Sequence, residues 1–118
     1  GGLPLSREPN ADAMANRASG ERVFGAPLES IRAAVADALN ELGWHWAPTA
    51  GGFSAVWTSR VFRFKDDVEI DLEARGPGET RIRARSRSRI GHYDWGQNAR
   101  HIRDLFRQIE ASRQVTGR

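Results

Sequence analysis

Residues 65–89 read KDDVEIDLEARGPGETRIRARSRSR and have the clearest secondary-structure pattern of the chain. Two runs of strict alternation flank the loop Gly76-Pro77-Gly78, a pattern typical of a β-hairpin. Acidic residues alternate with mostly apolar ones before the loop, and arginines alternate with small or apolar ones after it. Because successive side chains of a strand point to opposite faces, each run has one charged face and one face that suits a core. The stretch therefore predicts a long antiparallel hairpin, from about Val61 to Ala74 and from Glu79 to Arg89.

The charged faces also predict how the two strands are aligned. A three-residue loop places Arg75 opposite Glu79. The acidic row then faces the arginine row in the pairs Glu73–Arg81, Asp71–Arg83, Glu69–Arg85 and Asp67–Arg87. Such pairs contribute about 0.2–1 kcal/mol each. Unopposed arginines would indicate nucleic acid or lipid phosphates as partners, but the facing acids cancel most of their field. The pattern favours a solvated row of ion pairs over nucleic-acid binding.

Further elements are predicted on both sides of this hairpin. Aromatic and small residues recur at period two from Trp44 to Trp57, around a turn at 48–52, and indicate a second hairpin with one aromatic face. Apolar residues at helical spacing run from Leu28 to Leu42, with Pro27 before them and Gly43 after them. A last helix is expected to begin near Asp94, where Asp94 and Gln97 match a capping box.

The resulting fold class is α+β, with the element order β-α-β-β-β-β-α. We expect an antiparallel sheet of about five strands with two helices packed on one face. The 118 residues fit a single domain, predicted to span 21–113 and to begin with a short strand at Glu21–Gly25. Residues 1–20 lack periodicity and are predicted to form a mobile N-terminal arm, and 114–118 a disordered C-terminal tail.

Composition excludes several classes of site. The chain has no cysteine, so disulfides, thiolate zinc sites and cysteine nucleophiles are excluded. No apolar run approaches the roughly 18 residues of a membrane span, and the first residues do not read as a signal peptide. An upstream signal or anchor absent from this chain stays open. The formal charge of +3 is basic without defining a binding site. We expect no metal and no cofactor.

The core-facing side of the 65–89 hairpin ends in polar residues. Phe62, Phe64, Val68, Ile70 and Leu72 are expected to point inward, and Asp66 shares their parity. A carboxylate that faces an apolar layer costs free energy unless it is hydrogen-bonded, so its partners are expected within 88–98. The candidate ligand-binding residues at this end of the core are Asp66, Ser86, Ser88, Arg89, His92, Asp94 and Asn98.

Two interpretations of these residues stay open. In the first they form a structural clasp: Asp94 caps the last helix, Gly91 or Gly96 has a positive φ, and Asn98 bonds inward to the hairpin. In the second they line a small polar pocket. A triad of Ser88, His92 and Asp94 can be drawn, but no nucleophile elbow surrounds it. A metal set of His92, Asp94 and His101 lacks a recognised spacing. No residue is therefore assigned to catalysis or to a metal.

The same segments carry a resemblance to a known family. Residues 85–98 contain the string R-S-x-S-R-x-G-x-x-D-x-G-x-N, and Phe64–Val68 precedes it. Over about residues 60–110 the chain resembles the domain-of-unknown-function 1499 family of bacterial proteins. The resemblance implies a fold unit and a key loop, with no known activity. Family members often follow a signal, a lipid anchor or membrane helices, which implies a periplasmic or membrane-associated location. Many begin with a cysteine-containing motif that this chain lacks.

Three functions remain as hypotheses. The first is a non-enzymatic binding or envelope-associated module, with a small apolar or anionic ligand or a protein partner; the run Val23–Leu28 before a long helix is also similar to helix-grip lipid-binding domains. The second is a hydrolase that uses the polar 86–98 loop. The third is a structural domain for protein–protein assembly. A cavity of about 300–1,000 Å³ would favour a ligand, and a flat exposed apolar patch would favour assembly.

Overall fold

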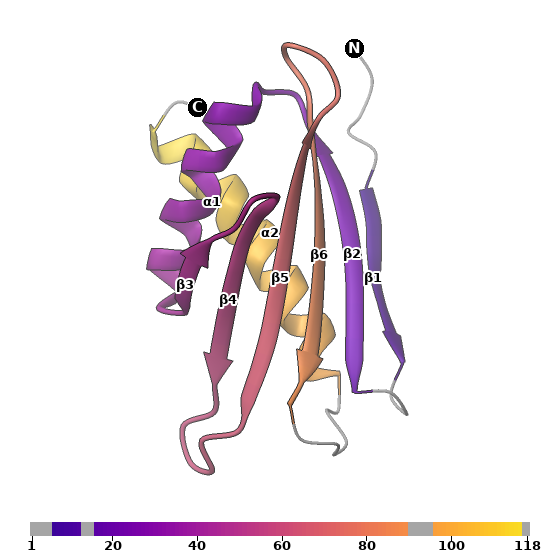
Figure 1. The fold of residues 1–118 in the computed structure, drawn as a ribbon, viewed down its shortest axis with the longest axis vertical. Coiled ribbons are helices and arrows are strands. Elements are labelled where there is room, and N and C mark those ends of the chain that lie inside the picture. The colour runs from indigo at the N-terminus through magenta and orange to yellow at the C-terminus, as the bar shows by residue number, and fades with distance from the viewer. Residues whose placement is uncertain (1–5, 13–15, 90–95, 117–118) are drawn as a thin grey trace.

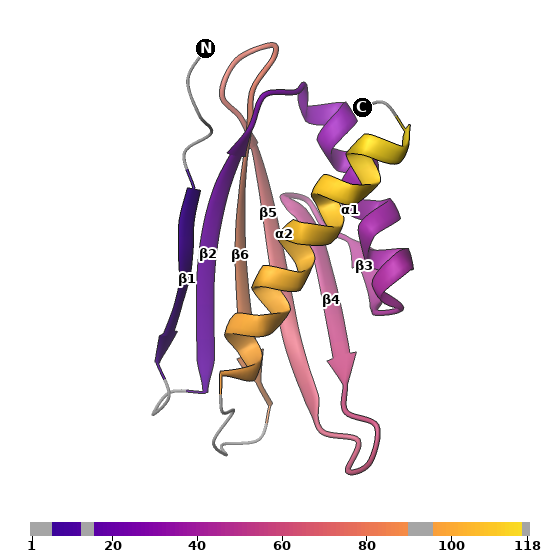
Figure 2. The same ribbon diagram turned by 180° about the vertical axis from the view of Figure 1, so that it is seen from behind.

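A computed structural model describes the backbone of residues 6–12, 16–89 and 96–116. One antiparallel sheet in the order β1-β2-β6-β5-β4-β3 carries two helices on one face (Figures 1 and 2). The elements are β1 (Ser6–Asp12), β2 (Arg17–Phe24), α1 (Leu28–Leu42), β3 (His45–Pro48), β4 (Gly52–Thr58), β5 (Lys65–Ala74), β6 (Thr80–Ser88) and α2 (Gln97–Thr116). The predicted α+β class is confirmed, and so is the element order from β2 onward.

The central hairpin has the predicted register. Asp71 lies opposite Arg83, Glu69 opposite Arg85 and Asp66 opposite Ser88. The Arg75 N–H donates to the Glu79 carbonyl across the three-residue loop, at 2.8 Å. The alternation of charged and apolar residues was sufficient here, because a shift by one residue would turn every apolar side chain of the strand to solvent.

Residues 6–12 and 17–20 differ from the sequence prediction, because they form strands. Residues 17–20, assigned to the arm, form the first half of β2, which pairs with β6 from Arg17↔Arg87 to Phe24↔Thr80. β1 pairs with β2, so the sheet has six strands where about five were predicted. Both segments lack the apolar alternation of a strand signal; residues 17–20 pair with the edge of β6, and β1 pairs with the edge of β2. At the other end, α2 continues to Thr116, into the segment predicted as a tail.

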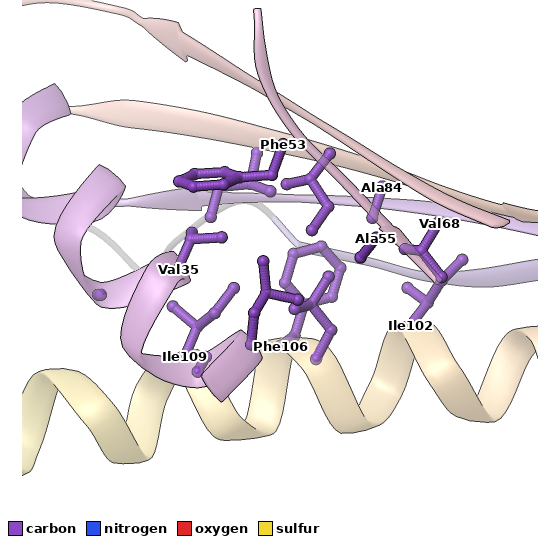
Figure 3. Close-up of a cluster of buried hydrophobic side chains, with 14 of the residues drawn as sticks. Val35, Phe53, Ala55, Val68, Ala84, Ile102, Phe106 and Ile109 are labelled. Atoms are coloured by element: carbon purple, nitrogen blue, oxygen red, sulfur yellow. The ribbon is translucent and has the colours of Figure 1, made fainter. Parts of the chain in front are cut away.

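The core lies between the sheet and the two helices. The inner face of β4, β5 and β6 meets Val35 of α1 and a row along α2 that includes Ile102, Phe106 and Ile109 (Figure 3). α1 ends where predicted, at Gly43, whose φ of 74° forms the left-handed cap that favours glycine. Among the described residues, no helix has the length and apolar character that crossing a membrane requires.

The segment before β5 corrects one prediction. The sequence pattern placed Phe62 in the hairpin, facing the core, but β5 begins at Lys65 and Phe62 is 73% exposed. Arg63 has a positive φ of 59°, which interrupts strand geometry and turns residues 59–64 into a loop between β4 and β5. Alternation alone could not reveal this turn, because it lacks glycine and proline.

The outer face of the sheet carries the ion pairs. Their partners differ from the four directly facing pairs that the sequence predicted. Only Glu73 and Arg81 form a salt bridge directly across β5 and β6. Arg85 reaches diagonally to Asp71 at 3.4 Å, and Arg83 turns to Glu21 of β2 at 3.2 Å. Most of the acids and arginines therefore compensate one another, as predicted, but through a network over three strands.

Candidate functional site

A buried carboxylate and a buried imidazole meet where α2 crosses the sheet. Asp66 of β5 is 2% exposed and His101 of α2 is 4% exposed. His101 Nε2 lies 2.8 Å from Asp66 Oδ2. This hydrogen bond joins the imidazole of α2 to the carboxyl group of β5. The burial predicted for Asp66 is correct, but its partner is His101, three residues beyond the predicted 88–98 segment.

Two tryptophan rings enclose the imidazole. The Trp44 ring meets the His101 ring edge-on with centroids 5.7 Å apart, and the Trp57 ring lies tilted at 4.5 Å. Trp57 is also the neighbour of Asp66 across β4 and β5. Trp44 follows the cap of α1, so α1, β4, β5 and α2 together position the imidazole. The His101–Asp66 contact consequently holds both indoles in place.

Trp44 and Trp57 are also among the residues that line a hollow of about 290 Å³. Its lining comes from the end of α1, from β3 and β4, and from the β4–β5 loop with the first residue of β5, and consists of Leu42, Gly43, Trp44, His45, Val56, Trp57, Thr58, Arg63 and Lys65. Among the described residues that line this tryptophan hollow, Arg63 and Lys65 are cationic and none is a carboxylate. Lys65 Nζ donates to Thr58 Oγ1 at 3.2 Å, which holds the ammonium group at the hollow.

A second polar cluster, the Asn98 clasp, joins α2 to the sheet. Asn98 is fully buried, and its Oδ1 accepts from the Ser86 hydroxyl at 2.6 Å. Its Nδ2 donates to Ser88 Oγ at 3.0 Å and to the Asn16 carbonyl at 2.9 Å. Three partners satisfy the amide, as buried polar groups require. The predicted inward turn of Asn98 toward Ser86 and Ser88 is confirmed, and the clasp also fixes the start of β2.

The remaining predicted site residues lie elsewhere. Arg89 is exposed and directed to Asp67, whose carboxylate accepts from Arg89 Nε and from its terminal nitrogen at 2.9 Å each. These charge-assisted bonds and the attraction of Asp67 raise the pKa of the Arg89 guanidinium above its ordinary value. His92 and Asp94, and with them the predicted helix cap and Gly91, lie outside the described residues. Gly96 has the expected positive φ, at 79°.

Sequence reasoning missed His101, Trp44 and Trp57 as site residues. A usable signal exists for His101, which lies three residues after Asn98 on the apolar side of α2 and next to Ile102. The tryptophans fit the aromatic face of a hairpin, and nothing in their spacing separates a hollow from a filled core. Among the described residues, no group of three or more potential ligands gathers to hold a metal ion.

The fold and the site define a small α+β domain with a buried imidazole–carboxylate pair behind a tryptophan-lined hollow. The chain belongs to the family described as Protein of unknown function (DUF1499), whose model matches residues 6–109. The resemblance noted over residues 60–110 is thereby confirmed and extended to the N-terminal strands. No curated protein matches the chain.

Proposed function

We propose that this chain is a non-enzymatic binding module that takes a small anionic ligand with a flat or apolar part in the tryptophan hollow. The observation that carries the proposal is that Trp44 and Trp57, whose rings both contact the buried His101 ring, are lining residues of one hollow. Aromatic rings that are already held in place bind a flat ligand at low entropic cost.

The charge of the hollow supports an anion. Arg63 and Lys65 are its ionic lining residues, and a carboxylate or phosphate can accept hydrogen bonds from both. Arg63 adopts a left-handed backbone conformation that is unfavourable for a residue with a side chain. Strain of this kind gathers at ligand clamps. Among the described residues that line the hollow, none is a carboxylate.

The size of the hollow limits the ligand. Typical small-molecule sites have volumes of about 300–1,000 Å³, and the 290 Å³ of the hollow lies just below that range. The proposal therefore concerns a compact molecule, such as an aromatic carboxylate or a small phosphate ester. It replaces the polar 86–98 segment as the ligand site, since Ser86, Ser88 and Asn98 are engaged in the clasp.

Calorimetric titration with benzoate and, separately, with inorganic phosphate tests the proposal. We expect benzoate to bind, and Lys65→Met to weaken its binding about tenfold or more through the lost charge-assisted bond. Arg107→Gln, which removes a charge from the exposed side of α2, is the matched control and should leave binding unchanged. Equal effects of the two variants would show nonspecific attraction of anions and contradict the proposal.

A second candidate function is hydrolysis, because a carboxylate that orients an imidazole is the arrangement of a general base. His101 and Asp66 have that contact but lie buried behind the indoles. The hydroxyl opposite Asp66, Ser88, serves the clasp. Ester turnover that His101→Gln abolishes while benzoate still binds would support the enzyme over the binding module.

A further inference from the structure

The β4–β5 loop, residues 59–64, holds apolar side chains in solvent at one end of the molecule. Val61 is 78% exposed and Phe62 is 73% exposed, and they are the exposed large hydrophobic residues of the described chain. Phe62 stacks on Phe64, with ring centroids 5.6 Å apart. The loop projects beyond the ends of β4 and β5 (Figures 1 and 2). Exposed apolar groups are unfavourable in water, so such a tip suits a partner that removes them from it.

The exposure results from the way the loop is built. The Ser59 N–H donates to the Phe64 carbonyl at 2.8 Å, and the Phe64 N–H donates to Ser59 Oγ at 2.8 Å. These two bonds close the loop at its base. The positive φ of Arg63 completes the turn. Val61 and Phe62 are therefore at the tip of a hydrogen-bonded turn and do not have a place in the core.

Basic residues alternate with the apolar ones through this segment. Arg60 precedes Val61, Arg63 separates the two phenylalanines, and Lys65 follows them. In the described part of the chain, neither Arg60 nor Arg63 forms a salt bridge with a carboxylate, in contrast to most arginines of the outer sheet face. Unpaired cations beside exposed aromatic and aliphatic side chains match the two layers of an anionic membrane surface, phosphate outside and acyl chain inside.

We infer that the 59–64 loop docks this domain on anionic lipid bilayers. Val61 and Phe62 enter the interfacial layer, and Arg60 binds lipid phosphates. A convex hairpin tip with two apolar side chains is too small for a stable protein interface, which needs about 800 Å² on each partner, whereas a bilayer accepts a single projecting loop. The start of β1 and the end of α2 lie at the opposite end of the domain and leave the tip accessible (Figure 1).

Co-sedimentation with phosphatidylglycerol–phosphatidylcholine vesicles tests this inference. We expect binding that weakens as salt rises, since salt screens the attraction. Phe62→Ser should weaken binding about tenfold through the lost apolar transfer. Arg60→Gln should weaken it about fivefold, the typical contribution of one basic residue near an anionic surface. Arg107→Gln on α2 is the charge-matched control, with an expected change below about twofold. Thermal melts of each variant verify that it is folded.

Several outcomes would overturn the inference. These are absence of vesicle binding, equal binding to pure phosphatidylcholine vesicles, or equal losses for Arg60→Gln and Arg107→Gln. Sedimentation velocity without lipid measures whether the chain associates with itself. Self-association that Phe62→Ser abolishes, in a chain that ignores vesicles, would assign the loop to a contact between copies of the chain. Benzoate binding to Phe62→Ser separates this loop from the tryptophan hollow, because the variant leaves the hollow's lining residues intact.

Discussion

At the residue scale, two inward polar side chains explain how the sheet and α2 are joined. Asp66 and Asn98 both point into an apolar layer, and each is satisfied by groups from another element. The sequence predicted both orientations, that of Asp66 from the alternation of residues along the strand and that of Asn98 from helical spacing. It could not predict that His101 would bind Asp66, because helix register decides which polar residue of α2 lies over which strand.

Asp66→Ala should destabilise the domain by about 1–3 kcal/mol, because it leaves the buried His101 ring without its hydrogen-bond partner. Urea unfolding followed by tryptophan fluorescence measures the change. Asp71→Ala removes an exposed acid from the same strand and should change stability by about 0.5 kcal/mol or less. If both variants unfold at the same urea concentration, the Asp66–His101 contact contributes nothing specific.

Asn98→Leu distinguishes the clasp from a ligand site. The substitution leaves the hydroxyls of Ser86 and Ser88 unsatisfied and should cost about 1–3 kcal/mol. Benzoate binding should fall only in step with the folded fraction, which circular dichroism and calorimetry on the same samples determine. Lost binding with an unchanged melting temperature would identify Asn98 as a ligand-binding residue.

At the scale of elements, prediction succeeded where alternation was strong and failed where a neighbour decides the structure. The 65–89 hairpin has a register that the charge pattern and the three-residue loop determine, and α1 has clear signals at both ends. β1 and the first half of β2 have no such pattern; β2 pairs with the edge of β6, and β1 pairs in turn with the edge of β2. The sequence of residues 59–64 alternates like a strand, but the positive φ of Arg63 makes a turn there. No glycine or proline marks that turn in the sequence.

Gly52 at the start of β4 should tolerate no side chain. A Cβ there would lie 2.0 Å from the Ile70 carbonyl oxygen of β5, and this backbone atom cannot move without disturbing the pairing of the strands. Gly52→Ala should therefore lower stability by at least about 1–3 kcal/mol. Gly78→Ala, in the open β5–β6 loop with nothing near its Cβ, is the control. Equal melting temperatures for the two variants would contradict the close approach of β4 and β5.

At the scale of the whole molecule, the two faces of the sheet have different roles. The inner face holds the core, the imidazole–carboxylate pair and the Asn98 clasp, and the outer face holds arginines that are mostly compensated by acids. The sequence predicted this division and the α+β class. It did not locate the tryptophan hollow, because that hollow brings together the end of α1, the β3–β4 hairpin and the β4–β5 loop, whose relative positions follow only from the packed structure.

The compensated outer face makes a prediction about nucleic acid. The chain should bind duplex DNA weakly and without sequence preference at moderate salt, because most arginines of β6 form salt bridges with acidic residues. An electrophoretic shift assay with two unrelated duplexes measures this. Glu73→Gln together with Asp71→Asn should strengthen the shift by releasing Arg81 and Arg85. Tight, sequence-selective binding by the unmodified chain would contradict compensation.

Native mass spectrometry of the chain purified from its own host tests whether the tryptophan hollow binds a small anion. We predict an added mass of a small acidic molecule on the folded chain. The added mass should be lost in Lys65→Met and kept in Arg107→Gln, each verified as folded by its charge-state distribution. Detection of the folded chain without any added mass would contradict an anion site in the tryptophan hollow. An added mass that Lys65→Met retains in full would contradict it as well.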